Sequence, residues 1–322
     1  MTAPATTPTT AIADQKKLLL PLAFAAVYLI WGSTYLAIRL AVETMPPFLL
    51  AGIRHLVAGA MLYGYLRLSG VAPPSRQQWL GALAVGTLLL CGGNGLVTYA
   101  QQTVPSGLTA LLIATVPLWM IVLHRFVFRG DSPALATWFG VALGAGGVVL
   151  LIGPDRIGFA GTPLAGMGML LVAAVLWAFG SLWSRRLTLP PSLWMSAAAQ
   201  MLTGGPVLLV VASISGEWAA FEPAQVSTSS ILAFVYLVVF GSIVGMTAYL
   251  YMLRYATPAA VGTYAFVNPA VAVMLGWLVL GETLDARSSL AMLLILGGVA
   301  TILAAQALGA RRVRRRACEA AA

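Results

Sequence analysis

The stretch YAQQTVPSGLTALLIATVP (residues 99–117) returns later in the chain as YMLRYATPAAVGTYAFVNP (residues 251–269). Both stretches begin with tyrosine and end with proline, at one offset of 152 residues (251 minus 99). Two earlier motifs, WGS at residues 31–33 and WAFGS at residues 177–181, resemble each other at a slightly shorter offset. Matched residues at a near-constant spacing indicate that the chain contains an internal repeat.

Apolar stretches of helix length fill nearly the whole chain around this repeat. The 322 residues are 60% hydrophobic and only 8% charged, which leaves too few polar residues to coat a soluble globule. Each apolar stretch is close to the roughly 20 residues that a helix needs to cross the hydrocarbon of a bilayer. The predicted spans are residues 18–40, 46–67, 79–101, 106–128, 134–153, 163–185, 192–214, 229–253, 258–280 and 287–309. The sequence therefore predicts an all-α integral membrane protein with ten transmembrane helices.

The repeat divides the predicted spans into two halves of five. The expected organisation is a disordered cytoplasmic N-terminus (1–17), a first five-helix repeat (18–153), a second five-helix repeat (163–309) and a basic cytoplasmic tail (310–322). An odd number of spans makes the second half enter the membrane upside down relative to the first. Such inverted repeats underlie alternating access in many secondary transporters.

Basic residues concentrate on one side of the predicted membrane. If the spans alternate from a cytoplasmic N-terminus, Lys16, Arg185 and the cluster at residues 311–316 lie inside, whereas Glu217 and Glu222 lie outside. This positive-inside bias predicts that both termini are cytoplasmic. The basic cluster is expected to bind anionic lipid headgroups, so the net charge of +9 does not indicate a nucleic-acid partner.

Several short motifs occur in an order and spacing that resemble a known family. They are IWGSTY at residues 30–35, PSGLTA at 105–110, ATVP at 114–117, YAFVNP at 264–269 and LGE at 280–282. With the five-plus-five layout, they resemble the EamA-type branch of the drug/metabolite transporter superfamily over about residues 18–310. The resemblance implies a metabolite exporter of the inner membrane, with amino acids among its solutes and a central cavity lined by both halves. A shared fold does not identify the substrate, so a drug or nucleotide-sugar carrier remains an alternative.

Polar and aromatic side chains within the predicted spans indicate where a solute would bind, because such groups are rare inside a membrane. The predicted substrate-binding residues are Trp31, Ser33, Arg54, Asn94, Tyr99, Trp119, Tyr264 and Asn268. Aromatic walls with a few amides and hydroxyls suit a zwitterion or a polar neutral solute with an apolar part. The cavity is expected near the midplane, between the first, third, fourth, sixth, eighth and ninth spans, because the other spans are mostly aliphatic.

Arg54 is the most informative single residue of this set. It lies about eight residues from the outer end of the second span, or roughly 12 Å deep at the helical rise per residue. A charge at that depth is costly unless it faces water or a partner. Arg54 is expected either to anchor a substrate carboxylate near the outer gate or to pair with Glu43 as a structural group. The histidines His55 and His124 are expected to be packing residues.

Two prolines, Pro117 and Pro269, occupy matched positions that are predicted to lie well inside the fourth and ninth spans. Proline inside a helix removes a backbone hydrogen bond and kinks the helix, so both residues are predicted hinges. The sequence contains no Walker motif and no Cys/His cluster with metal-ligand spacing, so neither a cofactor nor a metal is expected.

The function predicted from these features is secondary or facilitative export of small metabolites, without enzymatic activity. The predicted span interiors carry no Asp or Glu, which disfavours a pump for cations or quaternary amines. An intramembrane enzyme would need a catalytic cluster at one membrane depth. A channel would favour charged or carbonyl rings repeated around symmetric subunits. This chain supplies its own two-fold symmetry, which allows a monomer.

Overall fold

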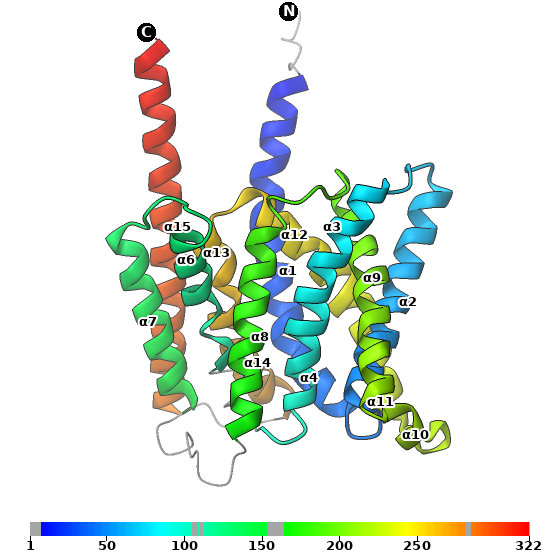
Figure 1. Cartoon of the computed structure of the whole chain (residues 1–322). Coiled ribbons are helices and arrows are strands. Elements are labelled where there is room, and N and C mark those ends of the chain that lie inside the picture. Colours follow the sequence, from blue (N-terminus) through cyan, green and yellow to red (C-terminus); the bar gives the residue numbers. More distant parts are fainter. Residues whose placement is uncertain (1–7, 105–108, 110–111, 153–163, 281–284, 322) are drawn as a thin grey trace, which may run out of the picture.

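The computed structural model of the chain is a bundle of helices (Figure 1). It describes residues 8–104, 109, 112–152, 164–280 and 285–321, and no strand occurs within these ranges. Of the described helices, seven are long and apolar enough to cross a membrane, and two shorter apolar helices cover Val116–Phe126 and Leu135–Leu151. Most of the motif at residues 105–110 and most of the motif at residues 280–282 lie outside the described residues.

The elements follow one another in a similar order in the two parts of the chain. The first part contains α1 (Pro8–Ala41), α2 (Pro47–Leu68), α3 (Arg76–Gly86), the π-helix η1 (Thr87–Gly95), α4 (Leu96–Ala100), α6 (Val116–Phe126) and α7 (Leu135–Ile152). The second part contains α8 (Leu164–Trp183), α9 (Leu193–Ile214), α10 (Glu217–Ala220), η2 (Pro223–Gln225), α11 (Thr228–Tyr236), the π-helix η3 (Leu237–Val244), α12 (Gly245–Tyr255), α13 (Pro258–Gly262), α14 (Tyr264–Leu280) and α15 (Ala286–Ala321). In both parts a π-helix interrupts a long helix, within residues 76–100 and 228–255.

Side-chain caps determine where two of these helices begin. Ser75 and Gln78 form a capping box before α3, in which each side chain accepts a hydrogen bond from the other residue's backbone N–H. At the start of α2, the Glu217 carboxylate accepts from Leu49 N at 2.8 Å and from Phe48 N at 3.3 Å. Glu217 therefore satisfies two N–H groups that the first helical turn leaves unpaired, and it ties α10 to α2.

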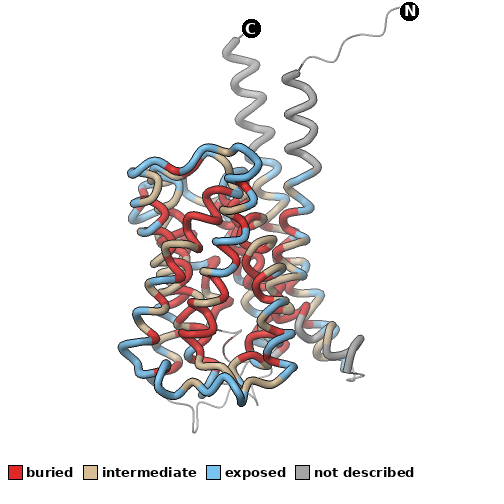
Figure 2. The backbone as a smooth tube through the Cα atoms, turned by 90° about the vertical axis from the view of Figure 1, so that its right-hand side faces the viewer, coloured by how far each residue is buried: buried red, intermediate tan, exposed pale blue. Residues whose placement is uncertain are grey.

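The outer surface of the bundle is apolar along its length. On α1, Leu22, Leu29 and Leu36 are each more than half exposed and lie seven residues apart, on one face of the helix. Figure 2 shows buried residues in the interior of the bundle and exposed residues along its outside. An exposed stripe of leucines is unfavourable in water but suits a helix that faces lipid.

Glycines allow the helices of two pairs to approach closely. α2 packs along α9, and α7 packs along α15. In the second pair, a Cβ atom on Gly298 would lie 2.6 Å from the Gly140 carbonyl oxygen and 2.7 Å from the Gly144 nitrogen. Small residues at such crossings let helix backbones touch, which is how helices commonly associate in membranes.

The substitution Gly298→Ala is expected to destabilise the protein by about 1–3 kcal/mol, the usual cost of over-packing a close contact. The atoms that the new methyl group would meet belong to the backbone and cannot rotate away. Gly146→Ala in α7 is the matched control, because nothing lies within 4 Å of its Cβ position. The melting temperatures of the purified variants in detergent test this. Equal melting temperatures would show that close approach of α7 and α15 is not required.

Both ends of the described chain lie on one face of the bundle. The start of α1 and the end of α15 project from that face (Figure 1), which we call the termini face. Residues 8–17 were expected to be disordered, but they form the first turns of α1. Extending a helix that has already formed costs far less than starting one, so the first span carries these residues into its helix.

The two predicted hinge prolines have different surroundings. Pro269 lies inside α14, as predicted. Pro117 does not lie well inside a helix, because a turn at residues 114–115 interrupts the chain and α6 begins at Val116. Pro117 is therefore in the first turn of α6, where its missing N–H would have had no partner in the helix. A second interruption, at Thr263, separates α13 from α14.

Candidate functional site

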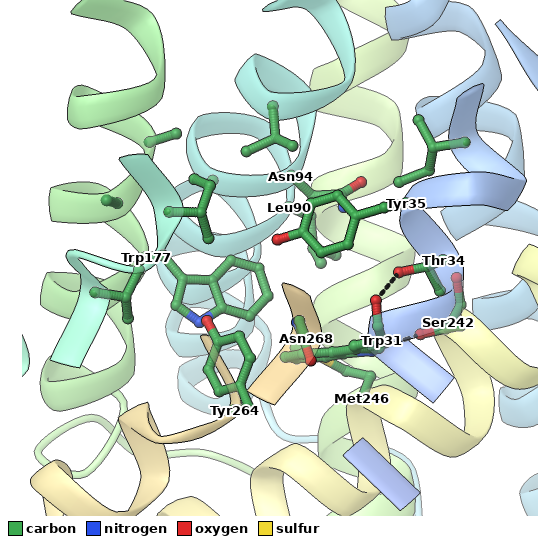
Figure 3. Close-up of a pocket in the computed structure, with 18 of the residues that line it drawn as sticks. Trp31, Thr34, Tyr35, Leu90, Asn94, Trp177, Ser242, Met246, Tyr264 and Asn268 are labelled. Atoms are coloured by element: carbon green, nitrogen blue, oxygen red, sulfur yellow. Dashed lines mark hydrogen bonds between the residues drawn. The ribbon is translucent and has the colours of Figure 1, made fainter. Parts of the chain in front are cut away.

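A cavity lies inside the bundle, between α1, α2, α8, α14 and the two π-helices (Figure 3). The cavity has a volume of about 90 Å³. Pockets for small molecules usually measure about 300–1,000 Å³, so this cavity is a narrow space that would not hold a drug-sized molecule.

The lining of the cavity extends toward the face opposite the termini. Ile38 lines it and lies one turn before the end of α1 at Ala41. Toward the termini face, Ser181, Tyr249 and Thr263 are fully buried. A layer of buried side chains therefore lies between the cavity and the termini face.

Trp31 is the centre of an aromatic floor. Its ring lies 5.4 Å from Trp177, 5.0 Å from Tyr249 and 5.1 Å from Tyr264, measured between centroids, and the contacts with Trp177 and Tyr264 are edge-to-face. Trp31 Nε1 also donates a hydrogen bond to the Gly241 carbonyl at 3.2 Å. Edge-to-face packing aligns the positive edge of one ring with the negative face of another, which makes this floor rigid.

Next to the aromatic floor, residues of α2, η1 and η3 form a polar wall of the cavity. Arg54 Nε donates to Ser242 Oγ at 2.8 Å. His55 lies within 3.4 Å of both Asn94 Oδ1 and Ser242 Oγ through its two ring nitrogens. Arg54 is only 4% exposed, and the described lining contains no Asp or Glu. The guanidinium is thus a buried positive charge without a carboxylate in the cavity, an arrangement that favours an anionic group of a ligand.

Asn268 lies at the same cavity and has one unused polar atom. Its Oδ1 is buried and has no hydrogen-bond partner among the described residues. An acceptor buried without a partner costs about 1–3 kcal/mol, which a donor group on a bound ligand would offset.

The π-helices shape the floor through two glycines. A π-helix carries an extra residue per turn and is frequent at functional sites. Gly93 in η1 packs against Trp177, and Gly245, directly after η3, packs against Trp31. A Cβ atom at either position would overlap the indole ring of the tryptophan that packs there. Each tryptophan therefore packs onto a glycine from the other part of the chain. These two glycines are 152 residues apart (245 minus 93), the offset of the sequence repeat.

The structure brings five of the eight predicted site residues together in the cavity lining. These are Trp31, Arg54, Asn94, Tyr264 and Asn268. They come from four different spans, since Tyr264 and Asn268 share α14, so only the tertiary fold makes them neighbours.

The other three predicted residues lie outside the described lining. Ser33 Oγ is hydrogen-bonded to the Tyr236 hydroxyl at 2.6 Å. Tyr99 stacks on Phe48 at 5.0 Å between ring centroids, and Trp119 is half-buried in the core. Their aromatic and hydroxyl groups are used in packing within the bundle.

Two expectations about the second span need correction. α2 was expected to be mostly aliphatic and to lie away from the cavity, but it contributes Arg54 and His55 to the lining. Of the two roles expected for Arg54, the pairing with Glu43 is wrong, because Arg54 lies in the cavity wall and bonds Ser242, while Glu43 is exposed. Helix rotation decides which side of α2 faces inward, and an apolar helix carries no amphipathic pattern that would reveal it.

Several lining residues lie outside the predicted set. They include Thr34, Tyr35, His55, Trp177, Ser242 and Met246. Trp177 belongs to the WAFGS motif, so its match with Trp31 was a signal that could have found it. Ser242 sits in an otherwise apolar segment with no such signal.

These features define a helical membrane protein with an internal cavity that is lined by aromatic and polar side chains. The model of the EamA-like transporter family matches residues 19–153 and 164–304. The chain belongs to the EamA-like transporter family.

Two proteins that are similar to this chain are transporters by name. The uncharacterized inner membrane transporter YedA of Escherichia coli (strain K12) is 41% identical over 287 residues, which cover 88% of this chain and 91% of that protein. The uncharacterized transporter YoaV of Bacillus subtilis (strain 168) is 24% identical over 275 residues, covering 85% and 93%. One solved crystal structure shares the fold with a TM-score of 0.70 at 20% identity, covering 89% of this chain and 98% of that one.

Proposed function

We propose that this protein exports small metabolites, with amino acids as the substrate class, across the inner membrane by secondary or facilitative alternating access. The proposal is based on the cavity, whose described lining contains the positively charged Arg54 and no Asp or Glu. The name of the relative YedA, an inner membrane transporter, supports the location.

The cavity chemistry favours a carboxylate over other charged groups. Arg54 offers guanidinium N–H groups to an anion, and Asn268 Oδ1 offers an acceptor to a donor group. The aromatic floor around Trp31 gives apolar contact area. An amino acid carries a carboxylate, an ammonium donor and a side chain, and so matches all three features. The proposed substrate-binding residues are Trp31, Arg54, Asn94, Tyr264 and Asn268.

We further propose ten spans arranged as two inverted repeats, at residues 18–153 and 163–309. Three observations support this arrangement. Both parts of the chain contain a long helix with a π-helical segment, Gly93 and Gly245 hold equivalent tryptophans, and helices of equivalent order pack together, as α2 does with α9 and α7 with α15. The proposed hinges are the interruption before Pro117 and the segment from Thr263 to Pro269.

Solute counterflow tests the proposed function. Proteoliposomes preloaded with one unlabelled amino acid should accumulate the same labelled amino acid, and a panel of labelled amino acids identifies the best substrate. Liposomes without protein, and the cavity variant Arg54→Gln, serve as controls. If no amino acid in the panel shows counterflow above empty liposomes, amino acids are not the substrate class.

The proposed topology has both termini in the cytoplasm and α10 outside. A single cysteine at Ala219, which is exposed in α10, is expected to react with an impermeant thiol reagent added to intact cells, in a chain whose native cysteines are replaced by serine. A chain that keeps only Cys318, in the basic tail, should react only after the membrane is opened. Equal labelling of both positions in intact cells would contradict this topology. With the tail inside, its arginines at 311–316 are placed to bind anionic headgroups.

A further inference from the structure

A second space opens on the termini face of the bundle. It lies between the segment that joins α8 to α9, the start of α9 and the last turns of α12. We call it the vestibule and define it by Ser184, Arg185, Ser196, Leu253 and Arg254. The vestibule has a volume of about 380 Å³, compared with about 90 Å³ for the cavity. The vestibule is therefore roomy enough to hold a hydrated solute.

Two guanidinium groups give the vestibule its charge. Arg185 Nη2 donates to the Ala256 carbonyl at 2.7 Å, and Arg254 Nη1 donates to the Pro191 carbonyl at 3.0 Å. A guanidinium has five N–H groups, so one such bond positions each head and leaves most of its donors free. The described lining contains no Asp or Glu. The vestibule is thus a recess with a positive potential.

One layer of side chains separates the vestibule from the cavity. On α12, Met246 lines the cavity, Leu253 lines the vestibule, and Tyr249 lies between them, completely buried. The Tyr249 hydroxyl accepts a hydrogen bond from Trp177 Nε1 at 2.8 Å and is hydrogen-bonded to Ser181 Oγ at 2.6 Å. Tyr249 therefore belongs to the buried layer between the two spaces.

We infer that the vestibule is a second binding site, which takes the carboxylate of the solute on the side from which the protein exports it. The inference rests on the proposed function. A positively charged recess raises the local concentration of anions. Arg185 and Arg254 would hold the carboxylate on one side of the Tyr249 layer, and Arg54 would receive it on the other side when the layer opens. The ligand class is a small carboxylate.

The electrostatic potential of the vestibule can be measured through the reactivity of a cysteine placed at Ser184, and this does not require that the substrate be known. Ser184 is half-buried in the vestibule lining, and its substitution by cysteine is small. The protein is placed in nanodiscs of zwitterionic lipid, with its native cysteines replaced by serine. The measured quantity is the rate of labelling by a sulfonate-bearing methanethiosulfonate divided by the rate of labelling by its trimethylammonium counterpart. This ratio should be about tenfold higher for Ser184→Cys than for free cysteine. Arg185→Gln with Arg254→Gln should abolish this preference. The control Arg67→Gln, at the end of α2 outside the lining, should keep it.

Protection of the same cysteine identifies the ligand. Butyrate is expected to slow the labelling of Ser184→Cys, whereas its neutral twin butyramide is not, and the double arginine variant should lose the protection. Protection only when phosphatidylglycerol is added to the nanodiscs would make the vestibule a site for a lipid phosphate and overturn the inference. Absence of an anionic preference would also overturn it. In both of these outcomes the wild-type protein would still show amino-acid counterflow. The inference about the vestibule can therefore fail while the proposed function holds.

Discussion

Replacing Arg54 with glutamine is expected to lower transport of a carboxylate substrate by about a hundredfold, because losing one partner of a buried, hydrogen-bonded charge pair costs 2–5 kcal/mol or more. Arg54 is 4% exposed, and its cavity offers a carboxylate no other formal positive charge among the described lining residues. The amide of the same substrate has no charge to pair. Its transport should fall much less.

Counterflow of the amino acid and of its amide is measured side by side below saturation. The two rates give the preference for the acid over the amide directly. Arg54→Lys should retain part of the preference, since it keeps the charge but lacks the planar fork of the guanidinium. Arg39→Gln in α1 is the matched control, because Arg39 is exposed and lies outside the described lining. An equal loss for the acid and the amide in Arg54→Gln would mean that Arg54 has a structural role through Ser242.

Replacing Asn268 with leucine is expected to lower transport of an amino acid by about tenfold or more, as the loss of a hydrogen bond to a charged group predicts. Leucine fills a similar volume but removes the acceptor Oδ1. The deaminated carboxylic acid of the same substrate should be affected less, because it has no ammonium group to donate. The two variants, Arg54→Gln and Asn268→Leu, should therefore discriminate between opposite ends of the solute.

Trp119→Phe is the control for this second experiment. The sequence alone places Trp119 in the binding set, but the structure puts it outside the cavity lining and half-buried in the core. Near-normal counterflow is expected, with the level of inserted protein measured in parallel. A loss in Trp119→Phe as large as that in Asn268→Leu would show that the transport path runs beside α6 instead.

The helical membrane architecture could be predicted from the sequence because it depends on local properties. A run of about 20 apolar residues must form a helix in a bilayer, whatever its neighbours are, since its backbone polar groups have no other partners. The internal repeat was equally visible, because Tyr99 and Pro117 recur as Tyr251 and Pro269 at one offset. The interruption before Pro117 was not visible, since the flanking residues are as apolar as the rest of the span.

The sequence by itself determined the membrane class, the family resemblance and the residue types available to a site. Only the tertiary structure decided which of those residues meet. It turned α2 so that Arg54 and His55 face the cavity, left Tyr99 and Trp119 in the packing, and paired Trp31 with Gly245 of the other half. The physical reason is that an apolar helix has no polar face to fix its rotation. Its orientation depends on how glycines and large side chains of distant spans fit together.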